Sequence, residues 1–181
     1  MARLNRTRFT ILGCLTIEPM SGYDVKRFID RTISHFWNES YGQIYPTLQA
    51  LEEEGLIEGE REPGERGPDR VVFRITNAGR EDLGRWLLEP AEPAVTRYEH
   101  SLKLFFGHVI GPSASLQHVE RLRERTRSEL DRLAAAEVEL EKSAASWAPY
   151  WLAVLRGGMR YSEMVLAWCD ATETDLRKVT P

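Results

Sequence analysis

The stretch that decides the fold covers residues 40–75 and reads SYGQIYPTLQALEEEGLIEGEREPGERGPDRVVFRI. In its first part the apolar residues recur at helical spacing and form one buried stripe: Ile44, Leu48 and Leu51. Ser40 and Gln43 have the spacing of a capping box, which predicts that a helix begins directly after Ser40. Gly55 predicts the end of this helix, because glycine adopts the left-handed conformation that commonly closes a helix.

The second part of the stretch changes from helical to strand periodicity. Residues 56–61 and 70–75 are expected to form two strands, and in the second of them apolar residues occupy every other position: Val71, Phe73 and Ile75. Residues 63–69 lie between the strands and are rich in proline and glycine, as in a turn. The stretch therefore predicts a helix followed by a β-hairpin.

The flanking sequence completes the order of a known DNA-binding domain. Further helices are expected over residues 7–18, 22–33 and 77–88. Ser21 and Thr76 precede two of these helices and are suitable N-cap residues. Three helices, a hairpin and a fourth helix follow one another in this order in a winged helix-turn-helix, which we expect over residues 1–89.

The remainder of the chain has helical periodicity only. Pro90 and Pro93 mark a short linker, and helices are expected over 98–109, over 113–143 and from Pro149 onward. The fold class is therefore mainly α, a winged helix-turn-helix domain followed by an all-helical dimerisation domain over residues 96–181.

The last two helices suggest that a second chain is needed. The long helix has a heptad-like seam, and the final helix is apolar on more than one side, so three helices of one arm give it too little cover. We therefore expect a homodimer. The expected interface residues are Leu122, Leu133, Leu140, Trp151, Leu155, Val165 and Trp168.

The charge of the chain limits how it can contact a nucleic acid. The net charge is −4, and both halves are acidic: residues 1–90 hold 12 basic and 15 acidic residues, and residues 91–181 hold 12 and 13. A protein of this charge is not attracted to DNA through its overall field. Any DNA contact must therefore use a local basic patch.

Several other classes of protein are not expected. No apolar run reaches the roughly 18 residues of a membrane span, and no secretion signal is present, so a cytoplasmic protein without a membrane partner is expected. Cys14 and Cys169 fit no metal or redox spacing and are expected to be small buried side chains. The four histidines lack the spacing of a zinc pair, and no catalytic motif is present. We expect no enzyme, no metal and no cofactor.

The sequence resembles the PadR family of transcription regulators, in the branch with a virulence-activator type of C-terminal domain. The matching strings of the N-terminal half are PMSGYD at 19–24, YGQIYPTL at 41–48, LEEEGLI at 51–57 and TNAGR at 76–80. Those of the C-terminal half are LKLFFG at 102–107 and the stretch from Arg156 to Trp168. The resemblance implies a homodimer that binds a roughly palindromic operator, usually as a repressor and sometimes as an activator.

The expected DNA contacts follow from the helix-turn-helix, whose recognition helix enters the major groove. With Ile44 at the centre of the buried stripe, the outward positions are Gly42, Tyr45, Pro46 and Gln49. Further expected contacts lie at the edges of the stripe, on the second helix and beside the turn of the hairpin: Gln43, Thr47, Tyr23, Lys26, Arg66 and Arg70. Pro46 removes an N–H inside this helix. Its match to the family string at 41–48 implies a special helix start. Tyr23 and Tyr45 have a second interpretation, as half-buried packing residues.

Two sets of arginines are open to different interpretations. Arg3, Arg6 and Arg8 form either a basic arm that contacts DNA or a solvated tail. The residues Arg121, Arg123, Arg125 and Arg127 are expected to be a solvated helix face, paired as Arg125 with Glu129, Arg127 with Asp131 and Arg123 with Glu120.

Two functions from different classes remain. The first is a sequence-specific DNA-binding transcription regulator, acting as a homodimer on double-stranded DNA. The second is a helical co-regulator that binds proteins and does not itself read DNA, which the acidic charge favours. The C-terminal half is also rich in aromatic residues. These rings either pack the dimer core or line a pocket for a small apolar effector.

Overall fold

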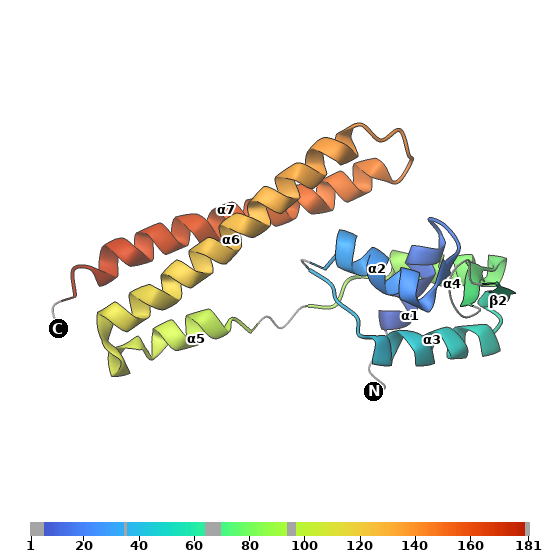
Figure 1. The fold of residues 1–181 in the computed structure, drawn as a ribbon, viewed down its shortest axis with the longest axis horizontal. Coiled ribbons are helices and arrows are strands. Elements are labelled where there is room, and N and C mark those ends of the chain that lie inside the picture. The colour runs from blue at the N-terminus through green and yellow to red at the C-terminus, as the bar shows by residue number, and fades with distance from the viewer. Residues whose placement is uncertain (1–5, 35, 64–69, 94–96, 180–181) are drawn as a thin grey trace. The chain divides into compact units, whose positions relative to one another are not determined.

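The computed structural model describes residues 6–34, 36–63, 70–93 and 97–179. The chain divides into two compact units, Met1–Pro93 and Ala94–Pro181, which we call the winged unit and the helical arm. The elements of the winged unit are α1 (Arg6–Leu15), β1 (Met20–Ser21), α2 (Gly22–Thr32), α3 (Tyr41–Glu53), β2 (Ile57–Glu62), β3 (Arg70–Ile75) and α4 (Asn77–Leu88) (Figure 1). The predicted winged helix-turn-helix is confirmed.

The helix ends of the winged unit follow from local sequence. At α2, the backbone N–H of Asp24 donates to the Ser21 hydroxyl at 3.2 Å, and the Ser21 N–H donates to the Asp24 carboxylate at 3.3 Å. At α3, the Ser40 N–H donates to Gln43 Oε1 at 3.1 Å. Both are capping boxes, and the one at Ser40 and Gln43 is as predicted.

The end of α3 needs its glycine. Gly55 has φ of +71° and donates from its N–H to the carbonyl of Glu52, while Leu56 donates to the carbonyl of Leu51. These two bonds form a Schellman motif, which turns the chain sharply from α3 into β2. The local sequence therefore fixes both ends of α3.

The described strands form a sheet in the order β1-β3-β2, with both pairs antiparallel. The hairpin registers Ile57 against Ile75 and Glu62 against Arg70. β1 was not predicted, because two residues are too few to show an alternating pattern. It ties the start of α2 to the hairpin, since Met20 lies opposite Phe73.

The core of the winged unit is continuous and lies between α1, α2, α3 and the sheet. Its most buried side chains have an exposed fraction of 1% or less: Ile11, Leu12, Val25, Ile29, Ile44, Leu48, Leu51 and Ile57. Leu83 of α4 joins this cluster, and the rings of Phe9 and Trp86 stack with centroids 4.6 Å apart. The buried stripe of α3 is thus held from several sides, which leaves its opposite face to solvent.

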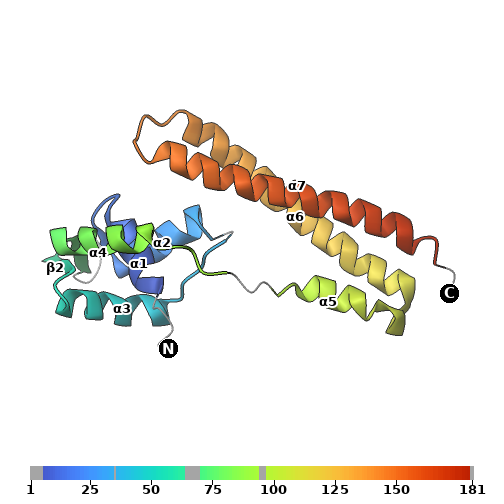
Figure 2. The same cartoon turned by 180° about the vertical axis from the view of Figure 1, so that it is seen from behind.

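The helical arm consists of α5 (Glu99–Phe105), a 3-10 turn (Gly107–Val109), α6 (Gly111–Glu141) and α7 (Ala148–Leu176). α6 and α7 run side by side as an antiparallel hairpin in both views (Figures 1 and 2). The expected single helix over 98–109 is wrong, because the α-helix ends at Phe105 and gives way to the 3-10 turn. The core here is small, with Val119 and Leu122 of α6 packed on Val165 and Cys169 of α7.

Candidate nucleic-acid and dimer interfaces

The outer face of α3 carries the predicted reading residues. Gly42, Tyr45, Pro46 and Gln49 are all exposed, whereas Ile44 on the opposite face is fully buried. α2 precedes α3 and packs against it, as the first helix of a helix-turn-helix does. The arrangement leaves this face available to a groove of DNA.

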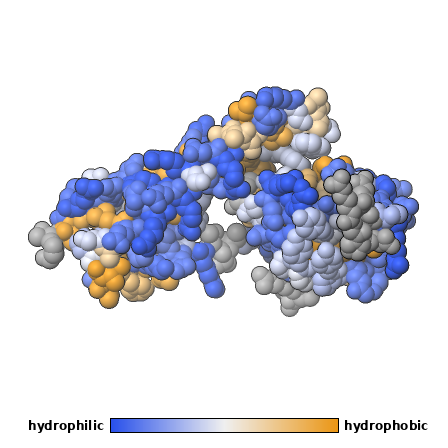
Figure 3. All heavy atoms as spheres, viewed as in Figure 1, coloured by the Kyte–Doolittle hydropathy of each residue, from blue (hydrophilic) through white to orange (hydrophobic). Residues whose placement is uncertain are grey.

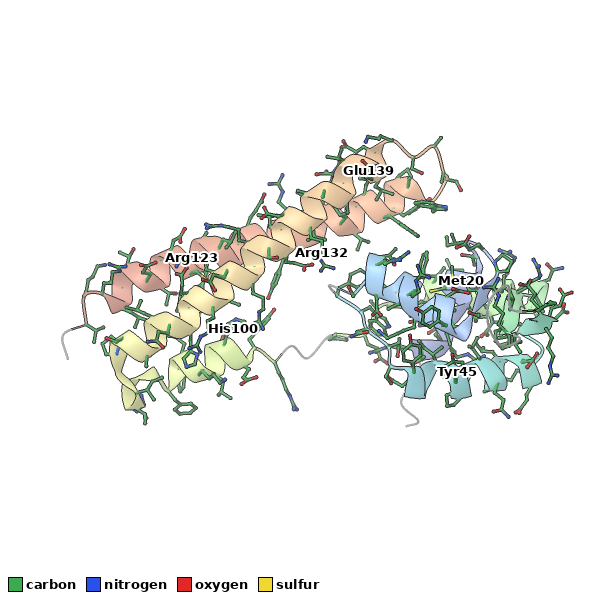
Figure 4. All side chains as sticks on the ribbon, in the orientation of Figure 1. Met20, Tyr45, His100, Arg123, Arg132 and Glu139 are labelled. Atoms are coloured by element: carbon green, nitrogen blue, oxygen red, sulfur yellow. The ribbon has the colours of Figure 1, made fainter. Side chains whose placement is uncertain are left out.

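Tyr45 is both exposed and supported. Its side chain is 52% exposed, and its ring lies 6.1 Å from that of Tyr41, centroid to centroid. A Cβ built on Gly22 would lie 2.7 Å from Tyr45 Cε1, so the ring packs closely on the start of α2. Figure 4 shows Tyr45 on α3 among the elements of the winged unit. The ring is therefore held in place while half of its surface faces solvent.

Gly42 and Pro46 belong to the same surface. A Cβ on Gly42 would meet only Ser40 Oγ, at 3.8 Å, so nothing within the described residues requires glycine there. Pro46 lies inside α3, which begins at Tyr41. Because proline has no N–H, the carbonyl of Gly42 lacks its usual helical donor. A small residue and a carbonyl without the Pro46 donor thus lie together near the start of α3.

Three other predicted residues of α3 have partners within the chain. Gln43 Oε1 accepts bonds from the N–H and the hydroxyl of Ser40. Thr47 is only 6% exposed and donates its hydroxyl to the Gln43 carbonyl at 2.7 Å. Gln49 is exposed and donates to Glu53 at 3.1 Å. Gln43 and Thr47 therefore stabilise the helix through bonds within it. Gln49 is accessible, and a contact of its amide with DNA would replace its bond to Glu53.

The predicted contacts of α2 lie on its surface. Tyr23 is 54% exposed, and the guanidinium of Arg27 lies 5.8 Å from the centre of its ring. Lys26 forms an ion pair with Asp30 and donates to Asn38 at 3.3 Å. A phosphate contact by Lys26 would replace a carboxylate partner that the lysine already has.

In the wing, as on α2, a basic residue predicted to contact a phosphate is paired with carboxylates. Arg70 lies 3.2 Å from the carboxylate of Glu62 and 3.7 Å from that of Asp24. Arg66, the other arginine predicted for the wing, lies outside the described residues. Arg70 is exposed, so its side chain is accessible to DNA while it remains paired.

The N-terminal arginines that the structure describes have internal partners. Arg6 pairs with Glu92, and Arg8 lies 2.8 Å from Glu54 and 3.0 Å from Asp82. Arg8 is also packed over the ring of Phe9. Both residues thus tie α1 to other parts of the winged unit rather than forming a free basic arm.

Two residues near the recognition helix were not identified from the sequence. Tyr41 is 43% exposed and extends the aromatic surface of Tyr45 to the first residue of α3. Glu39 is only 4% exposed, and its carboxylate accepts bonds from the Thr7 hydroxyl at 2.9 Å and from Trp37 Nε1 at 2.8 Å. Glu39 therefore fastens the turn before α3 to α1. Its isolated position in the sequence gave no signal of burial.

The expected dimer residues are divided between the inside and the outside of one arm. Leu122, Leu133, Leu155 and Val165 are each 5–8% exposed, because α6 and α7 already cover them. The other three, Leu140, Trp151 and Trp168, are partly exposed. The first group packs the hairpin of α6 and α7, and the second group stays partly accessible to a partner.

One group of exposed apolar residues of the arm lies on α5, the 3-10 turn and the residue after it. Its members, which we call the α5 patch, are Leu102 (59% exposed), Phe105 (77%), Phe106 (52%), Val109 (74%) and Ile110 (50%). Figure 3 shows hydrophobic residues at this end of the arm. Adjacent apolar side chains at such exposure are unusual in a monomer and mark an interaction surface.

Both cysteines are buried as predicted, with Cys14 at 4% and Cys169 at 0% exposure. Burial raises the pKa of the Cys14 thiol to about 12, so it stays protonated and unreactive at neutral pH. Within the described ranges, no cluster of three or more His, Cys, Asp or Glu residues has a metal-binding arrangement. Nor does any described helix combine the length and apolar character that crossing a membrane requires.

The fold and the exposed face of α3 define the class of the protein. A helix-turn-helix with a hairpin wing, followed by a helical arm, is the architecture of a winged-helix DNA-binding regulator. Comparison with known protein families then identifies the family within this class. The family model "Transcriptional regulator PadR-like family" matches residues 11–85, and "Virulence activator alpha C-term" matches residues 96–177. The chain belongs to the PadR-like family of transcriptional regulators, so it is a DNA-binding protein and not an enzyme.

Two curated relatives support this assignment. A probable transcriptional regulator of Mycobacterium tuberculosis, Rv1176c, is 30% identical over 93% of this chain and 96% of its own length. The negative transcriptional regulator PadR of Bacillus subtilis is 29% identical over 55% of each chain. Crystal structures of the Bacillus subtilis protein show the same fold. The complex with operator DNA has a TM-score of 0.82 at 21% identity and covers 93% of this chain and 98% of that chain. The complex with p-coumaric acid has a TM-score of 0.76 at 20% identity and covers 99% and 100%.

Proposed function

We propose that this regulator is a cytoplasmic homodimer that binds a palindromic operator through α3 of each chain and represses transcription. The observation that carries the proposal is the outer face of α3, where Gly42, Tyr45 and Gln49 are exposed opposite the buried Ile44. This face offers a small residue for close approach, a supported ring, and an amide that fits the edge of an adenine in the major groove.

The proposed DNA contacts fall into two groups. Tyr45 and Gln49 read bases, with Gly42 and Pro46 forming the surface that approaches the groove. The residues that hold phosphates are Tyr23, Lys26, Arg66 and Arg70. Gln43 and Thr47 act indirectly, because their hydrogen bonds to Ser40 and to the α3 backbone hold the reading face in shape. Such a division between positioning and reading contacts is general in protein–DNA complexes.

The proposed dimer forms through residues 96–181, and residues 1–89 carry the DNA-binding function. The α5 patch supports a partner there, since one arm leaves it uncovered. Two identical reading heads related by a twofold axis match an inverted repeat, and joining two modest half-site contacts raises the overall affinity. A bound dimer also excludes other proteins from the operator, which is the simplest route to repression. The structure of Bacillus subtilis PadR with operator DNA supports the proposal, as does the description of that relative as a negative regulator.

A small aromatic effector is part of the proposal. The arm has a pocket of about 180 Å³ lined by Tyr98, His100, Ser101, Tyr161, Met164, Val165 and Trp168. The rings of Tyr98 and Tyr161 lie 6.5 Å apart, and those of His100 and Trp168 lie 5.9 Å apart. The complex of Bacillus subtilis PadR with p-coumaric acid supports a ligand of this kind. Replacing Trp168 by Phe should then weaken binding of an aromatic effector and remove its effect on tryptophan fluorescence.

The second candidate is a co-regulator that binds proteins without reading DNA. One observation favours it: Lys26 and Arg70 both have carboxylate partners, in a chain of net charge −4. The experiment that separates the two candidates is selection of bound fragments from the host genome, followed by a mobility-shift titration at several salt concentrations. A regulator retains an inverted-repeat sequence and binds it more weakly as salt rises. Failure to retain any sequence at low salt would support the co-regulator.

A further inference from the structure

The helical arm contains a second pocket whose lining is cationic. It has a volume of about 440 Å³, within the range of small-molecule sites, and lies between the start of α5 and the first half of α6. Its lining residues are Arg97, Tyr98, Glu99, His100, Lys103, His118, Arg121, Leu122 and Arg125. Figure 4 shows His100 on the side of α5 that faces α6. The pocket thus gathers most of its charge from two helices that face each other.

The charge of this pocket is not neutralised within the chain. Four cationic side chains stand against one carboxylate, so the lining carries a net charge of +3 with both histidines neutral. The one carboxylate, Glu99, is already paired with Lys103 at 2.7 Å. Among the described residues, no carboxylate lies within 4.0 Å of Arg97, Arg121 or Arg125. This differs from the winged unit, where Arg8 and Arg70 each have two carboxylate partners.

The arrangement on α6 corrects the pairing expected from the sequence. Arg123 pairs with Glu120 as expected, but Glu129 pairs with Arg132 instead of Arg125. Arg121 and Arg125 are four residues apart and lie on the same face, where like charges destabilise a helix. The charge of Arg125 also reaches α5: together with burial, which acts more strongly, it lowers the pKa of His100. A chain with surplus acidic residues therefore keeps several cations together at a concave surface at an energetic cost.

We propose that this pocket binds a small oxyanion with two or more negative charges. Arg121 and Arg125 would hold it from α6, Lys103 from α5, and Arg97 from the chain leading into α5. Guanidinium groups suit carboxylate and phosphate oxygens because their donors match those oxygens in pairs. A singly charged acid would leave most of the positive charge in place, whereas a polycarboxylate or a phosphate ester neutralises it. The two pockets share Tyr98 and His100, but the pocket of the aromatic effector proposed above has no arginine in its lining, so the two ligands differ in chemistry.

Isothermal titration calorimetry on the full-length protein without DNA tests this site, with pyrophosphate and citrate as the probes and acetate as a singly charged control. The measurements are made at low ionic strength, where the Debye length exceeds about 10 Å. We expect saturable binding of one pyrophosphate or one citrate per chain and no saturable binding of acetate. If only pyrophosphate binds, the ligand is a phosphate. If only citrate binds, the ligand is a polycarboxylate. If both bind, the site selects its ligand by charge. Each of these outcomes supports the proposal.

The matched variants are the double substitution Arg121→Gln with Arg125→Gln, and the single substitution Arg127→Gln. Arg127 is an exposed arginine of the same helix that does not line the pocket. The double variant should weaken binding by about tenfold or more, and Arg127→Gln should change it by less than about twofold, because only the former loses direct contacts. Thermal melting with and without pyrophosphate adds a second readout, since a ligand of the folded state raises the melting temperature. The proposal is overturned if wild-type protein shows neither binding nor a melting shift with either probe, or if Arg127→Gln weakens binding as much as the double variant.

Discussion

The winged unit and the helical arm differ in how completely they bury their apolar side chains. In the winged unit, Ile11, Val25 and Ile44 are fully buried in a core that several elements enclose. In the arm, the buried cluster is small, and Phe105 and Val109 are 77% and 74% exposed. Burial of such side chains is the main stabilising contribution to a fold. The winged unit thus buries its apolar residues within one chain, while the arm leaves the α5 patch exposed, which supports the proposed dimer.

The two units also differ in how they use charge. Near the proposed DNA surface, Lys26 pairs with Asp30, and Arg70 pairs with Glu62 and Asp24. The Arg70 side chain is 55% exposed, so its pairs cost little to exchange, because a surface ion pair contributes roughly 0–1 kcal/mol. The Lys26 side chain is only 14% exposed, so its pair is the harder one for a phosphate to replace. The arm instead leaves Arg121 and Arg125 without a carboxylate partner among the described residues.

The largest effect is expected from placing a charge in the α5 patch. Phe105→Asp should convert the dimer to a monomer, because each chain would lose an apolar contact worth about 1.5–3 kcal/mol and would have to bury a carboxylate. With two copies per dimer, association weakens by about two to four decades. Light scattering at micromolar concentration measures this change. Leu88→Asp is the control, since Leu88 is 88% exposed in the winged unit. An unchanged dimer in Phe105→Asp would mean that the α5 patch is not the interface.

The next effect concerns the reading face of α3. Tyr45→Ala and Gln49→Ala should each weaken operator binding by about one to two decades, since a good base contact contributes roughly 1–3 kcal/mol. Folding and dimerisation should stay intact, because both residues are exposed. Fluorescence anisotropy with the selected operator gives the affinities. Gln117→Ala serves as the control because it removes an exposed glutamine of the arm. Retention of wild-type affinity and sequence preference by both α3 variants would contradict the assignment.

Replacing Gly42 by alanine should raise the stability of the protein and lower its affinity for the operator. Gly42→Ala should raise the free energy of unfolding by about 0.5–1 kcal/mol, because alanine favours a helix and the added methyl meets nothing closer than 3.8 Å. The same methyl should lower operator affinity up to about tenfold, by blocking close approach of α3. Urea unfolding and anisotropy measure the two quantities. Gly84→Ala, with nothing within 4 Å in α4, should give the gain in stability alone. If Gly42→Ala binds DNA as well as Gly84→Ala does, Gly42 does not lie against the groove.

The smallest effects are expected in the wing. Arg70→Ala should lower the slope of log affinity against log salt by about one, as loss of one phosphate contact does. Arg66→Ala, in the turn outside the described residues, should do the same. Glu62→Gln should raise affinity by a few-fold, because it releases Arg70 from a pair worth about 0.2–1 kcal/mol. The control is Glu58→Gln, which makes the same charge change on β2 at a position opposite Arg74. A larger gain for Glu62→Gln than for Glu58→Gln isolates the release of Arg70, and equal gains would show only a change in overall charge.

Much of the winged unit could be predicted because its signals are local. The capping pair of Ser40 and Gln43, the stripe of Ile44 and Leu48, and Gly55 define α3 within a few residues of sequence. The outward position of Gln49 then follows from helix geometry alone. What could not be predicted depends on how the elements pack together. The buried Glu39 carboxylate accepts bonds from Trp37 and from Thr7 of α1. Arg70 pairs with Glu62, which the hairpin register places opposite it, and with Asp24 of α2.

The arm shows where periodicity alone is insufficient. A heptad-like seam specifies that a helix packs along one side, but it does not say whether the partner belongs to the same chain. Here α7 covers Leu122 and Leu133, so the seam folds the hairpin. The helix expected over residues 98–109 ends at Phe105, and the residues of the α5 patch are exposed. The homodimer and its predicted interface residues stay predictions, and of these residues Leu140, Trp151 and Trp168 are partly exposed.

The central claim is that one chain reads a half-site and the arm joins two chains on an inverted repeat. Sedimentation velocity of the full chain and of a fragment of residues 1–93, each alone and with the selected operator duplex, tests it most directly. We expect the full chain to sediment as a dimer at micromolar concentration and to bind the duplex as two chains per inverted repeat. The fragment should be folded and monomeric, and should bind the duplex far more weakly. A full-length monomer, or a fragment that dimerises as well as the full chain, would contradict the account.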